Sequence, residues 1–400
     1  MLRSTPGRSV AIALCLAAAA TAALAADIDV NSTTDQQDAD TGDGVCDADT
    51  GTAGLQCTLR AAVQHANASP GLDLIRLPAG TYELSIRGRG RPAQRGDLDI
   101  TDAVRIEGAG PLATTIDAQR AKDRIFDVET PVQVEIVGLT LTHGRVRGGQ
   151  TGGGLRVDSG VVIVEDVMVT DCRAGHHGGA VDVLGGDVTL RRVWANGNAC
   201  GDSGGAVHID GGTLLIESSA LTNNRAASRG GGFSNGGVPA STLLNTTVSG
   251  NTARDGGGIS VSFGSTTDVV HCTVTANGTR RPGRGGGIST RIGTFIGPNV
   301  ARLTGTIVAG NTSESCVGGV QSLGGNIDDG TTCAFGGGVG DRSSTDPLLG
   351  PLTTVAGVTA VHPLLPGSPA VGLGSPPCPA TDQLGNPRGA PCDAGAVNGN

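Results

Sequence analysis

Lysine, aromatic residues and long apolar segments are scarce in this chain of 400 residues. Lys122 is its one lysine, aromatic residues make up 2% of it, and the formal net charge is −9. An acidic chain without a basic patch suits neither nucleic acids nor anionic membrane surfaces. Beyond the N-terminal region, no apolar run approaches the roughly 18 residues of a transmembrane helix. We therefore expect no nucleic-acid partner and no transmembrane segment, and so few aromatic rings weaken the case for tight carbohydrate binding.

Glycine, by contrast, is abundant, with 68 copies. This content is too high for an ordinary globular domain, yet the Gly-X-Y period of collagen is absent. The apolar fraction of 38% comes mainly from Ala, Val, Leu and Ile. A solenoid can use such a composition, because its core is a thin stack of small aliphatic side chains and each repeat contacts only its neighbours.

A motif of glycines followed by alternating apolar residues recurs through the middle of the chain. Copies begin at Gly152, Gly178, Gly204, Gly230, Gly256 and Gly285. The first four steps are 26 residues long and the last is 29. A fixed period of this length indicates a solenoid or a propeller. A propeller blade needs roughly 40 residues, so the shorter period favours a solenoid.

At this period the sequence forms columns that alternate between apolar and polar residues. One apolar column is Leu155, Val181, Val207, Phe233 and Ile259, and the next, two residues on, is Val157, Val183, Ile209, Asn235 and Val261. Such alternation is typical of a strand with one buried face. Further apolar columns begin at Val162, Val164 and Val169, which leaves no room for a helix. We therefore predict an all-β fold, a right-handed parallel β-helix of about 26 residues per coil.

Asparagines recur at the same period, at Asn198, Asn224, Asn251 and Asn277. Turn asparagines stacked in this way can bond side chain to backbone from one coil to the next. We expect them to form a structural ladder rather than a binding site.

Met1–Ala25 has the pattern of a secretory signal peptide. Arg3 and Arg8 supply the positive charge, Val10–Ala20 is the apolar centre, and a small-residue cleavage site ends at Ala25. The apolar run is too short to anchor the chain across a bilayer. We expect an exported protein that is either secreted or held at the cell surface.

Residues 26–70 precede the repeats and contain one segment without Gly or Pro. In it Leu59, Ala62, Val63 and Ala66 recur at helical spacing. A short amphipathic helix is therefore predicted, and we expect it to cap the solenoid, whose open end would otherwise expose a strand edge and an apolar core.

An acidic loop lies before this helix, and calcium is the one cofactor that the sequence leaves open. Its acidic residues are Asp38, Asp40, Asp43, Asp47 and Asp49. Their spacing does not fit the calcium loop of EF-hands. We expect a solvated loop closed by a disulfide, and no cofactor.

Ten cysteines are present, of which Cys15 lies in the predicted signal peptide. Export permits disulfides. The pairs closest in sequence are Cys46 and Cys57, Cys316 and Cys333, and Cys378 and Cys392. Cys172 and Cys200 are one coil plus two residues apart, so we expect them to bridge adjacent coils. Cys272 is left over in an inward column, where we expect a free, buried and inert thiol.

Two segments resemble known modules of exported bacterial proteins. Asp43–Asp47, Cys57–Ala62, Ala66–Ala68 and Asp73–Tyr82 resemble the CSLREA domain, with Thr58 and Ala61 in place of the Ser and Glu of its name-giving hexapeptide. This resemblance implies a bacterial exported protein with a right-handed parallel β-helix, and it implies no established chemistry.

Near the C-terminus, residues 364–371 and 378–397 resemble the choice-of-anchor module, although Gly372 stands where that family commonly has Asp. The chain thus divides into a signal peptide (1–25), a CSLREA-like N-terminal cap (26–70), a parallel β-helix (71–315), and Gly/Pro-rich C-terminal coils and tail (316–400).

The best candidate for chemistry is the outward column Arg156, Asp182 and His208, which stacked coils would bring together. Many parallel β-helices are polysaccharide lyases or glycoside hydrolases with sites on the outside of a sheet. Such chemistry needs paired carboxylates, or a base with charge stabilisation. Asp182 would be the acid or base, Arg156 would stabilise negative charge, and His208 would tune the pair. Asp158 and Asp210 are candidate binding residues two positions along.

A plainer interpretation is that this column is an ordinary polar surface, whose ion pairs contribute little to stability. His176 and His177 likewise read as a solvated turn rather than a metal site. Three functions remain. We favour a non-catalytic, monomeric surface-binding or adhesion protein whose ligand is an extracellular polysaccharide or cell-surface glycan. The alternatives are a polysaccharide lyase or glycoside hydrolase, and a structural or passenger-like surface rod.

Overall fold

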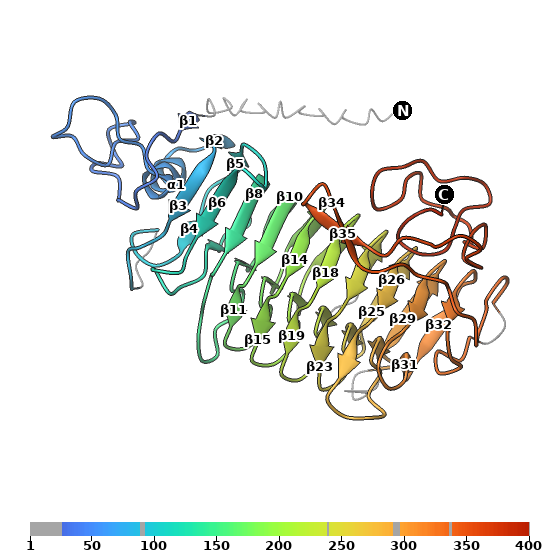
Figure 1. The fold of residues 1–400 in the computed structure, drawn as a ribbon. Coiled ribbons are helices and arrows are strands. Elements are labelled where there is room, and N and C mark those ends of the chain that lie inside the picture. Colours follow the sequence, from blue (N-terminus) through green and yellow to red (C-terminus); the bar gives the residue numbers. More distant parts are fainter. Residues whose placement is uncertain (1–25, 89–92, 238–239, 291–296, 336–337, 400) are drawn as a thin grey trace, which may run out of the picture.

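The computed structural model describes residues 26–88, 93–237, 240–290, 297–335 and 338–399. Over these residues the chain is a parallel β-solenoid with a single short helix (Figure 1). The predicted all-β fold is therefore confirmed. The predicted signal peptide, residues 1–25, lies outside the described residues. Within the described part, no helix is both long and apolar enough to cross a membrane.

Each regular coil contributes one strand to each of three faces. The first face contains β1 (Asp27–Asp29), β2 (Asp73–Leu77), β5 (Val104–Gly108), β8 (Gln133–Thr142), β10 (Val161–Thr170), β13 (Asp187–Arg191), β17 (Thr213–Glu217), β21 (Ala240–Leu244), β25 (Thr266–Val270), β29 (Val300–Thr304) and β32 (Val320–Ser322). The second contains β3 (Gly80–Glu83), β6 (Thr114–Asp117), β14 (Trp194–Asn196), β18 (Ala220–Thr222), β22 (Thr247–Ser249), β26 (Thr273–Thr275), β30 (Ile307–Ala309) and β33 (Ile327–Asp328). The long strands β8 and β10 run through both faces and join them into one sheet of 19 strands.

The third face is a separate parallel sheet of nine strands, and it carries the predicted candidate site. It contains β4 (Leu98–Ile100), β7 (Phe126–Val128), β9 (Leu155–Val157), β12 (Val181–Val183), β16 (Val207–Ile209), β20 (Phe233–Asn235), β24 (Ile259–Val261), β28 (Ile288–Ser289) and β31 (Cys316–Val317). A narrow ladder beside it contains β11 (Arg173–Ala174), β15 (Ala199–Cys200), β19 (Arg225–Ala226), β23 (Thr252–Ala253) and β27 (Gly278–Thr279).

The register follows the 26-residue period. Val181 pairs with Leu155 on one side and with Val207 on the other, and Phe233 and Ile259 continue the row. All five side chains are buried, at 0–1% exposure. The predicted inward column is therefore confirmed, and its aliphatic ladder removes apolar area from water at about 25 cal/mol per Å².

The asparagine column forms the predicted ladder. Asn224 accepts bonds at Oδ1 from the backbone N–H and the amide of Asn198, and its own amide donates to the Ala195 carbonyl and to Asn251 Oδ1. Asn277 and Asn311 continue the series. Backbone groups at a buried turn thus have partners, which an apolar side chain could not supply.

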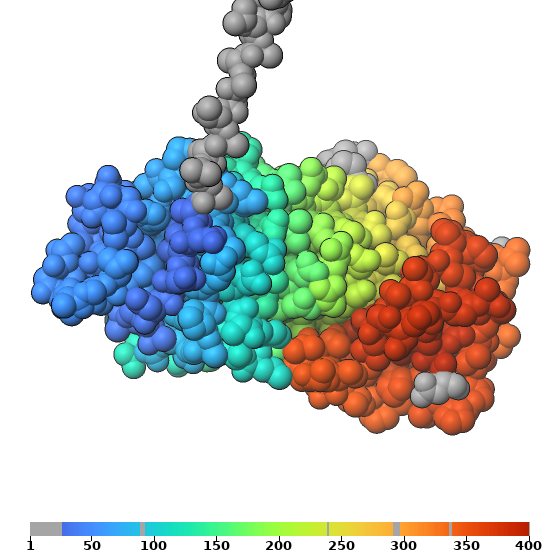
Figure 2. Space-filling view, turned by 90° about the horizontal axis from the view of Figure 1, so that it is seen from above, coloured from blue at the N-terminus to red at the C-terminus, as the bar shows by residue number. Residues whose placement is uncertain are grey.

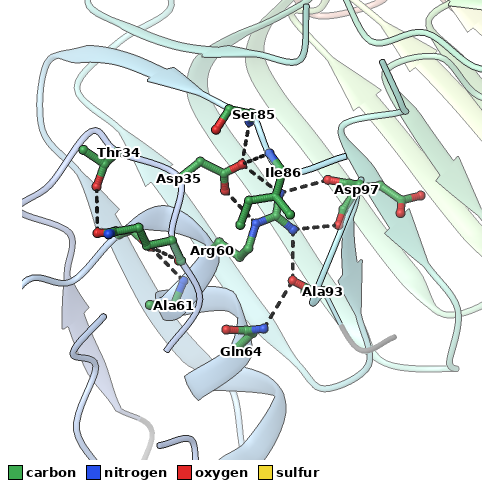
Figure 3. Close-up of polar contacts among 12 residues, drawn as sticks. Thr34, Asp35, Arg60, Ala61, Gln64, Ser85, Ile86, Ala93 and Asp97 are labelled. Atoms are coloured by element: carbon green, nitrogen blue, oxygen red, sulfur yellow. Dashed lines mark hydrogen bonds and ion pairs between the residues drawn. The ribbon is translucent and has the colours of Figure 1, made fainter. Parts of the chain in front are cut away.

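The N-terminal cap contains helix α1 (Leu59–Ala68), as predicted. It begins at Thr58, whose Oγ1 accepts from the Ala61 N–H at 3.1 Å, an N-cap bond that Ser or Thr can make. Arg60 is fully buried under this cap (Figure 3). Its guanidinium forms an ion pair with Asp35 at 2.6 Å and donates to the carbonyls of Ala93, Gly96 and Asp97. Arg60 therefore fastens the cap to the first coils.

The carboxylates of the acidic loop accept hydrogen bonds from the backbone of the same loop. Asp40, Asp43 and Asp49 each accept a bond from the backbone N–H two residues further on, at 2.9–3.0 Å. This is the bonding of Asx turns, and it accounts for the abundance of Asp in a loop. The Cys46–Cys57 disulfide ties the loop to the start of the helix.

Two further predicted disulfides are present, Cys316–Cys333 and Cys378–Cys392. The predicted Cys172–Cys200 bridge is wrong. Both thiols are free and buried, as is that of Cys272, for which a free thiol was expected. In register, Cys200 pairs with Ala174, so the two cysteines are offset by two positions along the strand. An offset of two residues and one strand gives a Cα separation of roughly 8 Å, beyond the reach of a disulfide.

The C-terminal region continues the coils and then folds back. Strands β31, β32 and β33 pair with β28, β29 and β30, so the solenoid extends beyond residue 315. Residues after 346 return along the second face, where a hairpin of β34 (Thr353–Val355) and β35 (Thr359–Val361) lies near β18 (Figures 1 and 2). Thr247 donates to Gln383 there, and Thr273 accepts from the Ala396 N–H. Outward residues of the second face, Ile307 and Ala309, form a buried apolar cluster with Leu364, Ala370 and Ala394 of the returning chain.

Candidate functional site

The outward column of the nine-stranded sheet is partly enclosed by the glycine turns that precede its strands, and we call this column with its turns the trough. Asp182 is 0% exposed and His208 is 2% exposed. The glycine turns fold closely over their own strands: a Cβ added to Gly204, which has a φ of +72°, would lie 2.6 Å from the Cβ of His208. The glycine of the repeat is required here for both its conformation and its size. The interpretation of this column as ordinary surface pairs is therefore wrong for Asp182 and His208.

Asp182 and His208 form a buried pair between neighbouring strands. Their side chains come from β12 and β16, which pair in register, and His208 Nδ1 lies 2.8 Å from Asp182 Oδ1. Burial raises the pKa of Asp182, but the hydrogen bond and the charge of His208 outweigh it, so the pKa lies below its usual value. The ionised carboxylate accepts the Nδ1 proton and leaves Nε2 of the imidazole facing the trough.

Arg156 belongs to a different cluster from the one predicted. It forms ion pairs with Asp127 at 3.2 Å and with Asp158 at 2.6 Å, and these are its ion pairs among the described residues. Arg156 and Asp182 are register partners on β9 and β12, so the predicted neighbourhood is present, but within the described residues Arg156 does not form an ion pair with Asp182. The cause is local: Asp158 lies two residues after Arg156, just beyond the end of β9, and Asp127 is the register partner of Arg156 on β7.

A hollow of about 370 Å³ opens beside His208. Its charged and aromatic lining comprises His177, Asp202, His208, Asp210, Arg229 and Phe263. The His177 ring stacks on the His208 ring with centroids 4.2 Å apart, and the Arg229 guanidinium lies over the Phe263 ring at 5.1 Å. Asp210, predicted as a binding residue, does lie here, 3.7 Å from His208 Nε2. Asp158 lies with Arg156 instead.

Several residues of the hollow were missed by the sequence analysis, although the 26-residue period contains them. Ser203, Arg229 and Asp255 pair from coil to coil at the turn before the third face, and His177 precedes Ser203 by 26 residues. The turn column thus runs beside the strand column. His177 was assigned to a solvated turn, yet burial, together with His208 and His176, lowers its pKa to about 4. It is therefore neutral at neutral pH.

Ser234 follows His208 in register and completes a row of Asp, His and Ser on three adjacent strands. Its Oγ is buried and has no hydrogen-bond partner. A serine nucleophile needs contact with its base, so this row lacks the bond that would activate it.

The fold and the trough define the class of this protein as a parallel β-helix with a polar site on the outer face of one sheet. No family model matches the chain, and no curated protein shows significant similarity to it.

Proposed function

We propose that this protein binds a polysaccharide in the trough of the nine-stranded sheet, at the hollow beside His208. The observation that carries the proposal is the hollow itself, because it combines exposed hydrogen-bonding groups with one aromatic face. Coils that repeat about every 4.8 Å present a row of different polar groups along the trough, and such a row can contact successive residues of a linear polymer.

The charges of the hollow favour a neutral glycan. The Asp210 side chain is 44% exposed and that of Asp202 is 27% exposed, so both can accept hydrogen bonds from sugar hydroxyls. Arg229 can donate, and the half-buried Phe263 contributes an aromatic ring to the lining, one face of which Arg229 covers. The net charge of −9 opposes a uronate polymer.

A second candidate is a polysaccharide lyase or glycoside hydrolase, and the Asp182–His208 pair favours it. A buried carboxylate that fixes the tautomer of an imidazole makes its other nitrogen a general base. Asp210, 3.7 Å from that nitrogen, would be its companion carboxylate. Arg156 lies in the cluster with Asp127 and Asp158, so it does not take part at this position.

The remaining features of the proposal come from the sequence. The N-terminal pattern supports export, and the similarity to CSLREA and choice-of-anchor modules supports a bacterial protein that is secreted or retained at the cell surface. We propose a monomer, because the solenoid has its own cap and its own returning tail. A surface rod without a ligand is the outcome if no glycan binds.

The test is a glycan array with neutral and anionic polysaccharides, followed by a titration of each glycan that is retained. Asp210→Ala should weaken binding at least tenfold. Asp187→Ala is the matched control, because Asp187 is an exposed residue of β13 on the first face. Retention of no glycan, or equal affinity of the Asp210 variant and the wild type, would refute the proposal. Cleavage of a retained glycan by the wild type would favour the second candidate.

A further inference from the structure

We propose that His177, His208 and Asp210 bind a divalent transition-metal ion, with Zn²⁺ as the best match. One ligand atom from each of these side chains lies within 4.8 Å of the other two. The three come from one turn and from β16 with the residue that follows it, so the stacking of two coils assembles the site. The inference does not depend on glycan binding.

His208 is already oriented as a ligand. Its Nδ1 lies 2.8 Å from the buried carboxylate of Asp182, so in the neutral imidazole Nδ1 donates to Asp182 and Nε2 is the ligand atom. Histidines that bind metals almost always donate their second ring nitrogen to a carboxylate, a backbone carbonyl or water. A buried aspartate under an imidazole is costly in a purely structural role, whereas in a metal site it orients the ligand.

His177 supplies the second nitrogen ligand, and its own hydrogen bonding is incomplete. Its Nδ1 is buried and has no hydrogen-bond partner, and the nearest carboxylate oxygen, Asp202 Oδ2, is 3.8 Å away. A small rotation toward Asp202 would give His177 the same carboxylate support that Asp182 gives His208.

Asp210 completes a set of two nitrogens and one carboxylate oxygen. Its side chain is 44% exposed and lies 3.7 Å from His208 Nε2. Ligands at about 2.0–2.1 Å in a tetrahedron are roughly 3.4 Å apart, so only a small contraction is needed. The hollow leaves the fourth position open to water or to a ligand, as in catalytic zinc sites.

The donor set excludes the calcium that the sequence left open, at least at this place. Ca²⁺ takes six to eight oxygens, whereas imidazole suits Zn²⁺, Cu²⁺ and Ni²⁺. The competing cluster of His176, His177 and Asp202 shares one histidine but has no buried carboxylate under a second one. A third cluster, Asp97, Asp99 and Asp127, is already filled by the guanidinium of Arg124.

The test is calorimetric titration of Zn²⁺ into the full chain, purified without a histidine tag and dialysed against a chelator. We expect one Zn²⁺ per chain. Asp210→Ala and His177→Ala should each lower the affinity at least tenfold, and Asp182→Asn should lower it about 10–100-fold. His143→Ala is the matched control, because His143 also contacts an aspartate, Asp117 at 3.1 Å, but does so outside the hollow. Co²⁺ should give visible absorption bands in the wild type that the Asp210 variant lacks.

Asp210 decides the outcome, because its half-exposed side chain can be removed without unfolding the coil; circular dichroism checks this. Absence of stoichiometric Zn²⁺ binding by the wild type would overturn the proposal. So would an Asp210 variant that binds Zn²⁺ as tightly as the wild type. Loss of binding in His176→Ala with no loss in Asp210→Ala would place the metal at the neighbouring cluster and would equally overturn it.

Discussion

The imidazole of His208 lies 2.8 Å from the carboxylate of Asp182, on the outer face of a sheet where both side chains are nonetheless buried. A pair on the outside of a solenoid would ordinarily be solvated and nearly neutral in energy. Here the glycine turns pack closely over the pair, so each of the two buried side chains depends on the other as a hydrogen-bond partner. The pair links the fold to the candidate site, because it holds one imidazole nitrogen toward the hollow.

Asp182→Ala should therefore lower the free energy of unfolding by about 1–3 kcal/mol, since it leaves the buried N–H of His208 without an acceptor. Urea unfolding monitored by circular dichroism would measure this change. Asp187→Ala, at an exposed position of β13, serves as the control and should change stability by less than about 0.5 kcal/mol. Equal effects of the two substitutions would contradict the buried geometry.

Arg60→Ala should loosen the N-terminal cap and destabilise the chain by about 3–5 kcal/mol, because the buried carboxylate of Asp35 loses its charged partner and keeps only the backbone N–H groups of Ser85 and Ile86. Arg60→Lys should restore little of this, since an ammonium cannot reproduce the planar fork of donors. Thermal unfolding is the measurement.

The matched control is Arg76→Ala. Arg76 also forms an ion pair at the N-terminal end, with Asp27, but both side chains are about half exposed or more. Its loss should have little effect on stability. If Arg60→Ala unfolded at the same temperature as Arg76→Ala, the proposed fastening role of Arg60 would be wrong.

The thiols of Cys172, Cys200 and Cys272 should resist alkylation in the folded protein and react when it is unfolded. Burial raises the pKa of each to about 12, so the reactive thiolate is scarce at neutral pH. Mass mapping of the non-reduced and unfolded protein should find, among the nine cysteines after residue 25, three labelled thiols and three disulfides. Any cross-link between Cys172 and Cys200 would show that the coil register described above is wrong.

Stability should depend on pH through Asp97. Burial, with the charge of Asp123 adding to it, raises the pKa of Asp97 to about 7 from an ordinary 3.8. Between these values the folded state holds a proton that the unfolded state has released. The contribution of this group is therefore fully present below about pH 4 and is lost as the pH rises to about 7. Asp97→Asn cannot ionise, so its stability relative to the wild type should increase between pH 5 and pH 8; a constant difference would refute the assignment.

The regular coils could be predicted from the sequence because one period governs them. Leu155 and Val181 occupy equivalent positions 26 residues apart, and stacking of the coils places residues of the same type next to each other. The wrong prediction of a Cys172–Cys200 disulfide came from the same period. Cys172 and Cys200 are 28 residues apart, and those two extra residues separate them along the strand.

The candidate site was predicted only in part. The repeat period and the polarity pattern indicate which residues are neighbours, but they do not indicate how deeply those residues are buried. The alternation assigned Asp182 and His208 to the outward face correctly, yet nothing in it indicated that the turns would bury them. The partner choice of Arg156 depended on Asp127, which lies in an irregular coil outside the 26-residue repeat. The returning tail depends on contacts across more than 100 residues, such as that between Asn245 and Thr381, for which the sequence has no local pattern.

Hydrogen–deuterium exchange of the full chain, with and without the tightest-binding glycan of the array, tests most directly whether the hollow is the functional site. The account predicts slower exchange in residues 176–178, 202–210 and 229–237, which surround the hollow, and unchanged exchange in strands β13 and β17 of the first face. Protection of those strands, or saturating glycan with no protection around His208, would contradict it.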